Sequence, residues 1–139
     1  MKKLLTAIIM IACIVIKTKQ SAGQDTHPID KETKKCFEKD YTTAGMVNCA
    51  SIAYNKWDAE LNKNYKLLMS KLSEAEKLTL KNSQLAWIKY RDLEFNVLND
   101  LYGHKEGTMY IPIRSMSRVE IVKKRALELK SYYDLLSKE

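Results

Sequence analysis

Apolar residues recur at steps of three and four along most of this chain, and that spacing restricts the fold more than any other feature. In an α-helix, residues spaced in this way share one face. No run alternates with a period of two for long enough to suggest a β-sheet. Two such stripes are present: Met46, Ala50, Tyr54, Trp57, Leu61, Tyr65, Leu68 and Leu72; and Val119, Val122, Ala126, Leu129, Tyr133 and Leu136. Between them, Leu80, Trp87, Phe95, Leu98 and Tyr102 are spaced by seven, eight, three and four residues, which also places them on one face of a helix. The sequence therefore predicts an all-α fold, a small bundle of three main helices.

Local signals indicate where the first two helices begin. Thr42 or Thr43 is a suitable N-cap for the first helix, which is predicted to run to about Lys71. Ser73–Glu76 has the spacing of a capping box, in which the serine and the glutamate satisfy each other's free backbone N–H groups.

The second helix is predicted from about Glu74 to Tyr102, with Gly103 ending it. Ser117–Glu120 has the spacing of a second capping box, although the third helix could begin a turn earlier, near Pro112. Because the links are short, successive helices are expected to be antiparallel neighbours.

The N-terminus has the pattern of a secretory signal peptide. Met1–Lys3 is positively charged, Leu4–Ile16 is an uncharged apolar run of 13 residues, and Ser21–Gly23 is made of small residues. The apolar run is shorter than the roughly 20 residues that a spanning helix needs. We expect cleavage after Gly23 and a periplasmic or secreted protein with no stable membrane span.

Two other readings of this segment remain open. The segment could stay uncleaved as an anchor. Alternatively, Met10–Cys13 resembles a lipobox, which would make the protein a lipoprotein anchored through Cys13. Residues 24–35 are polar and have no sustained period, so we predict a flexible lead-in there. The helical domain is then expected at residues 36–139.

The charge of the chain does not indicate nucleic-acid binding. The net charge is +7, and four of the lysines lie in the predicted signal peptide, which has no acidic residue. The remaining +3 is small and dispersed, whereas nucleic-acid binding requires a concentrated basic patch.

Export also bears on the cysteines. After cleavage only Cys36 and Cys49 remain, and an even number in an oxidising compartment favours a disulfide. Closing a loop of about 14 residues would contribute on the order of 3 kcal/mol. Two free thiols are the alternative. Neither His27 nor His104 has a ligand spacing to these cysteines, so no metal or other cofactor is predicted.

A polar group is predicted where the first two helices meet. Arg91 lies on the apolar face of the second helix and cannot lose its charge. Antiparallel packing would give it Asp58 as a partner. The expected polar core network is Asp58, Asn62, Tyr65, Gln84 and Arg91, and the expected aromatic core is Trp57, Trp87 and Tyr90. Such a network would fix helix register. The functional alternative is a polar pocket lined by Trp57, Trp87 and Tyr65.

Catalysis has little support in the sequence. There is no G-x-S-x-G, no cysteine near a histidine, no H-E-x-x-H and no glycine-rich phosphate loop. Pairs such as Asp58/Glu60 and Asp92/Glu94 stand two residues apart, so their side chains diverge by about 200° on a helix. No catalytic residue is predicted, and we expect the protein to act by binding.

The segment from Gly103 to Ile113 contains the remaining turn signals, two glycines and Pro112. Its tip, Met109–Ile111, is apolar, which is unusual for a solvated loop. The tip could contact a partner, but we favour a tip that folds back onto the bundle.

Several spaced motifs resemble the LprI family of small exported bacterial domains. They are Cys36, Met46–Ala50, Trp57–Asn62 followed by Tyr65, and Gln-x-x-Trp-x-x-Tyr-Arg-Asp over Gln84–Asp92. The likeness covers about Cys36 to Glu94, with a looser tail to Leu129. It implies an exported helical domain in which the cysteine pair closes the start of the first helix.

The chain departs from the family at a second pair of cysteines. Members often carry one just after the Arg-Asp-x-Glu segment and another before the last helix. Here those places hold Phe95 and, near the second, Met116 or Ser117. A second disulfide is therefore absent, and Phe95 and Met116 are expected to replace it by apolar contact.

The family name implies inhibition of lysozyme, whose cleft works with two carboxylates. An inhibitor is expected to insert a loop that carries donors or a cation, and the candidates are His104, Lys105, Tyr110 and Arg114. The net +3 argues against this, because many lysozymes are cationic. The alternatives are an envelope interaction or assembly module with another protein partner, and a small-ligand pocket or enzyme.

Overall fold

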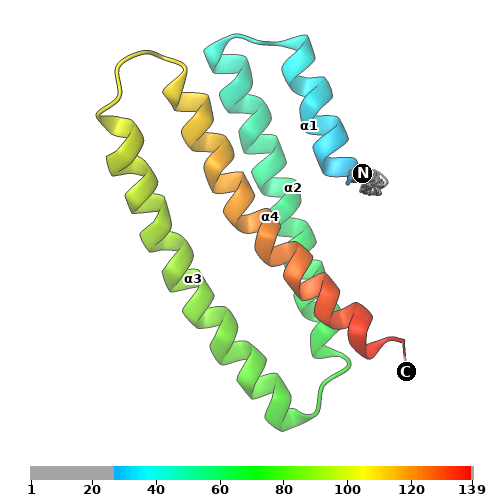
Figure 1. Cartoon of the computed structure of the whole chain (residues 1–139). Coiled ribbons are helices and arrows are strands. Elements are labelled where there is room, and N and C mark those ends of the chain that lie inside the picture. The colour runs from blue at the N-terminus through cyan, green and yellow to red at the C-terminus, as the bar shows by residue number, and fades with distance from the viewer. Residues whose placement is uncertain (1–26, 139) are drawn as a thin grey trace, which may run out of the picture.

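The computed structural model describes residues 27–138, and this part of the chain is all-α with no strand. It contains α1 (Pro28–Lys39), α2 (Thr43–Met69), α3 (Glu74–Gly103) and α4 (Tyr110–Leu136) (Figure 1). The predicted all-α class is confirmed, but there are four helices where three were predicted. The predicted signal peptide and the possible lipid site at Cys13 lie outside the described residues.

The additional helix, α1, corrects the predicted lead-in. Residues 28–35 are helical because the local sequence caps a helix start. His27 is the N-cap, and its ring Nδ1 accepts a hydrogen bond from the Ile29 N–H at 3.3 Å. Pro28 occupies the first turn, where its missing N–H costs nothing. The partly buried side chain of Ile29 packs against the core.

The disulfide joins α1 to α2. Cys36 and Cys49 are bonded, with their Cα atoms 5.7 Å apart, as the sequence predicted. The turn between the two helices is also close-packed. A Cβ built on Gly45 would lie 2.0 Å from Cγ of Asp40, so any larger residue there would force the Asp40 side chain to move. These two features hold α1 alongside the first half of α2.

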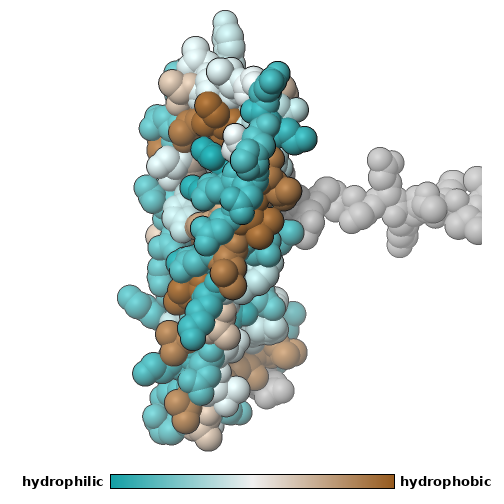
Figure 2. Space-filling view, turned by 90° about the vertical axis from the view of Figure 1, so that its left-hand side faces the viewer, coloured by the Kyte–Doolittle hydropathy of each residue, from teal (hydrophilic) through white to brown (hydrophobic). Residues whose placement is uncertain are grey.

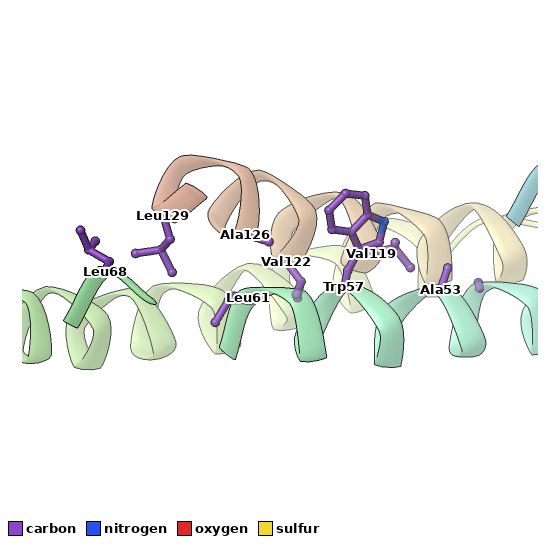
Figure 3. Close-up of a cluster of buried hydrophobic side chains, with 9 residues drawn as sticks. Ala53, Trp57, Leu61, Leu68, Val119, Val122, Ala126 and Leu129 are labelled. Carbon is purple, nitrogen blue, oxygen red and sulfur yellow. The ribbon is translucent and has the colours of Figure 1, made fainter. Parts of the chain in front are cut away.

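The core lies between α2 and α4, which run parallel and side by side (Figures 1 and 3). Trp57 and Leu61 of α2 face Val119 and Val122 of α4 (Figure 3). The fully buried apolar cluster consists of Ala50, Ala53, Trp57, Leu61, Leu68, Val119, Val122, Ala126 and Leu129. The stripes predicted for the first and third helices therefore do form the core.

α3 connects the end of α2 to the start of α4 and runs in the opposite direction to both. It packs mainly on α4 (Figure 1). None of its residues is fully buried; Leu80, Trp87 and Phe95 are partly buried against the core. The expectation that α2 and α3 pack as antiparallel neighbours is wrong, because α4 takes the place beside α2. Among the described residues, no helix combines the length and apolar character needed to cross a membrane.

The predicted helix starts are confirmed for α2 and α3. The hydroxyl of Thr42 accepts a hydrogen bond from the Gly45 N–H at 3.0 Å. The Glu76 carboxylate accepts one from the Ser73 N–H at 2.8 Å, which completes the capping box. Hydrogen bonds from the Ser73 side chain and backbone lower the pKa of Glu76.

The second predicted capping box is wrong. α4 begins at Tyr110, so Ser117 lies inside the helix, and its hydroxyl donates to the Ile113 carbonyl at 3.0 Å. This agrees with the alternative of an earlier start near Pro112.

Candidate functional site

The turn between α3 and α4 lies at one end of the molecule, at the same end as the α1–α2 link (Figure 1). Every residue from Gly103 to Met109 is exposed. Gly107 has φ +96°, in the left-handed region that strongly favours glycine. The turn therefore presents His104 and Lys105 to solvent on a tightly folded backbone.

The turn and the first coils of α4 enclose a recess of about 330 Å³. The rings of Tyr102 and Tyr110 lie 6.3 Å apart between centroids and hold the turn against α4. The recess is lined by Tyr102, Gly103, Lys105, Gly107, Thr108, Tyr110, Ile111 and Arg114. Three of the four residues predicted for partner binding, Lys105, Tyr110 and Arg114, thus share one recess, and His104 is outside its lining.

The apolar tip of this segment folds back only in part. Tyr110 is partly buried against Tyr102, as predicted. Met109 and Ile111 remain 60% and 43% exposed, which contradicts a tip that packs on the bundle. Met109 instead lines a second recess, which the sequence did not indicate.

This second recess, which we call the methionine recess, lies on the other side of the start of α4. It has a volume of about 470 Å³ and is almost entirely apolar. Its lining consists of Phe37, Met46, Met109, Pro112, Ile113, Met116, Ser117 and Glu120. Met109 and Met116 are seven residues apart, which is two helical turns. This spacing was the signal in the sequence that both side chains could line one surface. The two recesses make this end of the domain the candidate binding surface.

The chain matches a family model described as "Lysozyme inhibitor LprI" over residues 35–129. It belongs to the LprI family. The match includes both bridged cysteines and the whole α3–α4 turn with its two recesses. The resemblance inferred from the sequence is thus confirmed.

Two relatives place this LprI-family chain among known proteins. An uncharacterized protein of Rhizobium meliloti is 32% identical over 95 residues, which cover 59% of this chain and 67% of the relative. A crystal structure of an uncharacterized protein from Burkholderia thailandensis superposes with a TM-score of 0.73 at 26% identity. That match covers 80% of this chain but only 55% of the solved one, so the chain spans about half the length of that protein.

The predicted polar network is wrong about its central pair. Nη2 of Arg91 donates to the carboxylate of the adjacent Asp92 at 2.7 Å, and its guanidinium lies over the rings of Trp87 and Phe95. Asp58 instead accepts from the side-chain amide of Asn62 at 3.1 Å, within α2. The physical reason is that α3 packs on α4, which separates Arg91 from Asp58.

A different arginine, Arg125 of α4, occupies the buried position. It is 7% exposed, and its Nε donates to Oε1 of Gln84 on α3 at 3.0 Å. Its Nη1 donates to Glu128 at 2.6 Å and its Nη2 to Ser83 at 3.3 Å. Gln84 therefore belongs to a polar network as predicted, but the network joins α3 to α4.

The charge of Arg125 also affects its neighbour. Burial alone would raise the pKa of Glu128, but hydrogen bonds from Arg125 and Tyr132 outweigh burial and lower it. Burial of Arg125 was not predicted from the sequence. Its position three residues after Val122 and four before Leu129, on the apolar stripe, was the signal that it is buried.

Asn64 is a second buried polar residue that the sequence reading missed. It is 1% exposed, and its amide donates to the Ala126 carbonyl at 3.0 Å, joining α2 to α4. It lies three residues after Leu61 and four before Leu68, on the buried stripe. Tyr65, predicted for the network, is partly buried and packs against the core.

The predicted aromatic core is correct for only part of its members. Trp57 is fully buried and Trp87 partly buried, but Tyr90 is 52% exposed on α3. The ring of His27 lies 4.4 Å from that of Trp57, and the Lys123 ammonium lies 5.6 Å from it. Because the Trp57 ring is covered in this way, it does not line the polar pocket considered from the sequence.

We expect Arg125→Ala to lower the free energy of unfolding by about 1–3 kcal/mol, because it removes buried hydrogen bonds and leaves Gln84 without its partner. Arg91→Ala is the matched control and should cost less than about 1 kcal/mol, since Asp92 is solvated. Urea unfolding followed by circular dichroism measures both. A larger loss for Arg91→Ala would contradict this assignment.

Proposed function

We propose that this LprI-family chain is an exported binding protein that inhibits a lysozyme or a related cell-wall-degrading enzyme. The family description supports inhibition. The signal-like pattern at residues 1–23 and the Cys36–Cys49 bridge support export, since disulfides persist in oxidising compartments. The protein acts by occupying its target.

The observation that carries the proposed site is the grouping of Lys105, Tyr110 and Arg114 around one recess on the exposed turn. A lysozyme cleft contains two carboxylates. Arginine recognises a carboxylate through two parallel hydrogen bonds, and lysine adds a point charge. Tyr110 adds a rigid aromatic surface of the kind that dominates many protein interfaces. The turn at the end of the helices is well placed to enter a cleft.

The proposal predicts that the protein slows the clearing of a cell-wall suspension by lysozyme at a near-stoichiometric ratio. The double variant Lys105→Ala, Arg114→Ala should need at least about tenfold more protein for the same slowing, because truncating charged interface residues typically costs more than about 1 kcal/mol each. The optical density of the suspension is the readout, and several lysozyme types should be compared.

Lys66→Ala is the matched control, because it removes an exposed lysine from α2, far from the turn. It should inhibit as the unmodified protein does. No slowing by the unmodified protein with any lysozyme type would reject inhibition. Equal potency of the double variant would reject this turn as the site.

A second candidate function is an envelope interaction or assembly module without inhibitory activity, and the methionine recess favours it. Methionine-lined apolar surfaces adapt to varied protein partners. The net +3 outside the predicted signal also opposes encounter with cationic lysozymes. In this case a partner captured from envelope extract should be lost with Met116→Asp and retained by the Lys105→Ala, Arg114→Ala variant.

A further inference from the structure

α3 carries an apolar stripe that nothing in the described part of the chain covers. Leu93 is 65% exposed, Val97 46% and Leu101 60%. Figure 2, which views the molecule from the α3 side, shows a brown band running obliquely between teal side chains. The stripe is Ala86, Tyr90, Leu93, Val97 and Leu101, and all five residues are exposed.

These residues have the spacing of a helix-pairing seam. They follow one another at steps of four, three, four and four, so they lie within about 80° of each other around the helix. The face that α3 turns towards α4 contains different residues, among them Leu80, Trp87 and Phe95. α3 is therefore apolar on two sides, and only one of them is covered within the described residues.

The charges beside the stripe are arranged for pairing with a second copy of the same helix. Lys89 and Asp100 are 11 residues apart, three helical turns, so both lie on the same flank of the stripe. Both side chains are exposed, and neither forms an ion pair within residues 27–138.

A two-fold axis between residues 94 and 95 would make two antiparallel copies of α3 self-complementary. Lys89 of each copy would then face Asp100 of the other, twice over, on the same side of the seam. The same axis would bring Leu93 of one copy beside Val97 of the other. A helix of different sequence would not in general carry an aspartate and a lysine at the matching positions on both sides of this axis. A second copy of α3 does, so it fits the surface best.

We propose that the protein forms an antiparallel two-fold dimer through the exposed stripe of α3, flanked by reciprocal Lys89–Asp100 ion pairs. The stripe and the ion-pair residues lie outside the α3–α4 turn, so the dimer does not rest on the proposed inhibitory site. With the axis between residues 94 and 95, the turn of each copy would lie beside the first half of the partner's α3, on opposite sides of the axis.

The size and charge of the interface predict a dimer that dissociates on dilution. With the axis between residues 94 and 95, the two copies of α3 overlap only over residues 86–103, about 27 Å of helix. Specific dimers bury roughly 800 Å² on each partner, and a pair of helices about 10–12 Å in diameter supplies only part of that area over this length. On the other flank, the two Glu94 side chains approach each other near the axis and weaken the pairing.

Sedimentation velocity of the purified, disulfide-containing protein over a range of concentrations tests the proposal. The unmodified protein should shift from monomer to dimer as its concentration rises. Leu93→Asp should be monomeric throughout. Ile52→Asp is the matched control, because Ile52 is 44% exposed on α2, and it should dimerise normally. Circular dichroism should show the same helix content in all three proteins.

The charge exchange tests the register. Lys89→Asp and Asp100→Lys should each weaken the dimer by about tenfold, since each removes two ion pairs and creates two like-charge contacts. The double exchange should restore most of the affinity. A monomer at every concentration, a dimer insensitive to Leu93→Asp, or a double exchange no tighter than the single variants would overturn the proposal.

Discussion

Replacing Trp57 with alanine is expected to lower the free energy of unfolding by about 3–5 kcal/mol. Trp57 is the largest fully buried side chain, and it packs at the centre of the α2–α4 contact. Its removal would leave a cavity beside Val119 and Val122 that two straight helices cannot collapse to fill (Figure 3). Part of the loss would also come from α1, because the His27 ring would no longer have an aromatic partner.

Denaturant unfolding followed by circular dichroism measures this loss. Trp87→Ala is the matched control, since Trp87 is only partly buried and lies on α3. It should cost clearly less than Trp57→Ala. Equal losses for the two tryptophans would mean that α3 contributes as much to the core as α2, which contradicts the fold described above.

Removing the disulfide is the second large effect. The double variant Cys36→Ser, Cys49→Ser should lose about 3 kcal/mol, because the bridge closes a loop across a separation of 13 residues. The loss should concentrate in α1, which has no fully buried residue of its own. The α2–α4 core should persist, since it does not depend on the bridge.

Amide hydrogen exchange distinguishes these two parts. In the double variant, protection should fall along Pro28–Lys39 and remain along the middle of α2. Ala44→Ser is a suitable control, because it introduces a serine at an exposed position in the first turn of α2 without touching the bridge, and it should leave α1 protected. Uniform loss of protection in the double variant would show that α1 is part of one cooperative core.

The helices themselves could be predicted well from the sequence, because periodicity and capping are local. The stripes of α2 and α4, the Thr42 cap and the Ser73–Glu76 box all appear in the structure. α1 was missed because the predicted lead-in ended at residue 35, which separated Ile29 from Cys36 and Phe37 on the same helical face. Its position beside α2 depends also on a covalent bond, which a periodicity argument does not consider.

The neighbours of each helix could not be predicted in this way. A stripe shows that a helix has an apolar face but does not show which other helix covers it. The short links suggested sequential pairing, and this led to the Arg91–Asp58 prediction. Because α4 lies beside α2, Arg125 and Asn64 take the buried polar positions instead. Both residues lie on the apolar stripes, so the spacing of the stripes predicts that each of them is buried.

The parallel pairing of α2 with α4 has a consequence for how the protein is made. Asn64 and Ala126 touch although 62 residues separate them, so most of the apolar surface that buries Trp57 is missing until α4 has been synthesised. Contacts between such distant segments form late and slowly. The proposed export requires an unfolded chain, and a nascent chain that stays open until α4 emerges would meet that requirement.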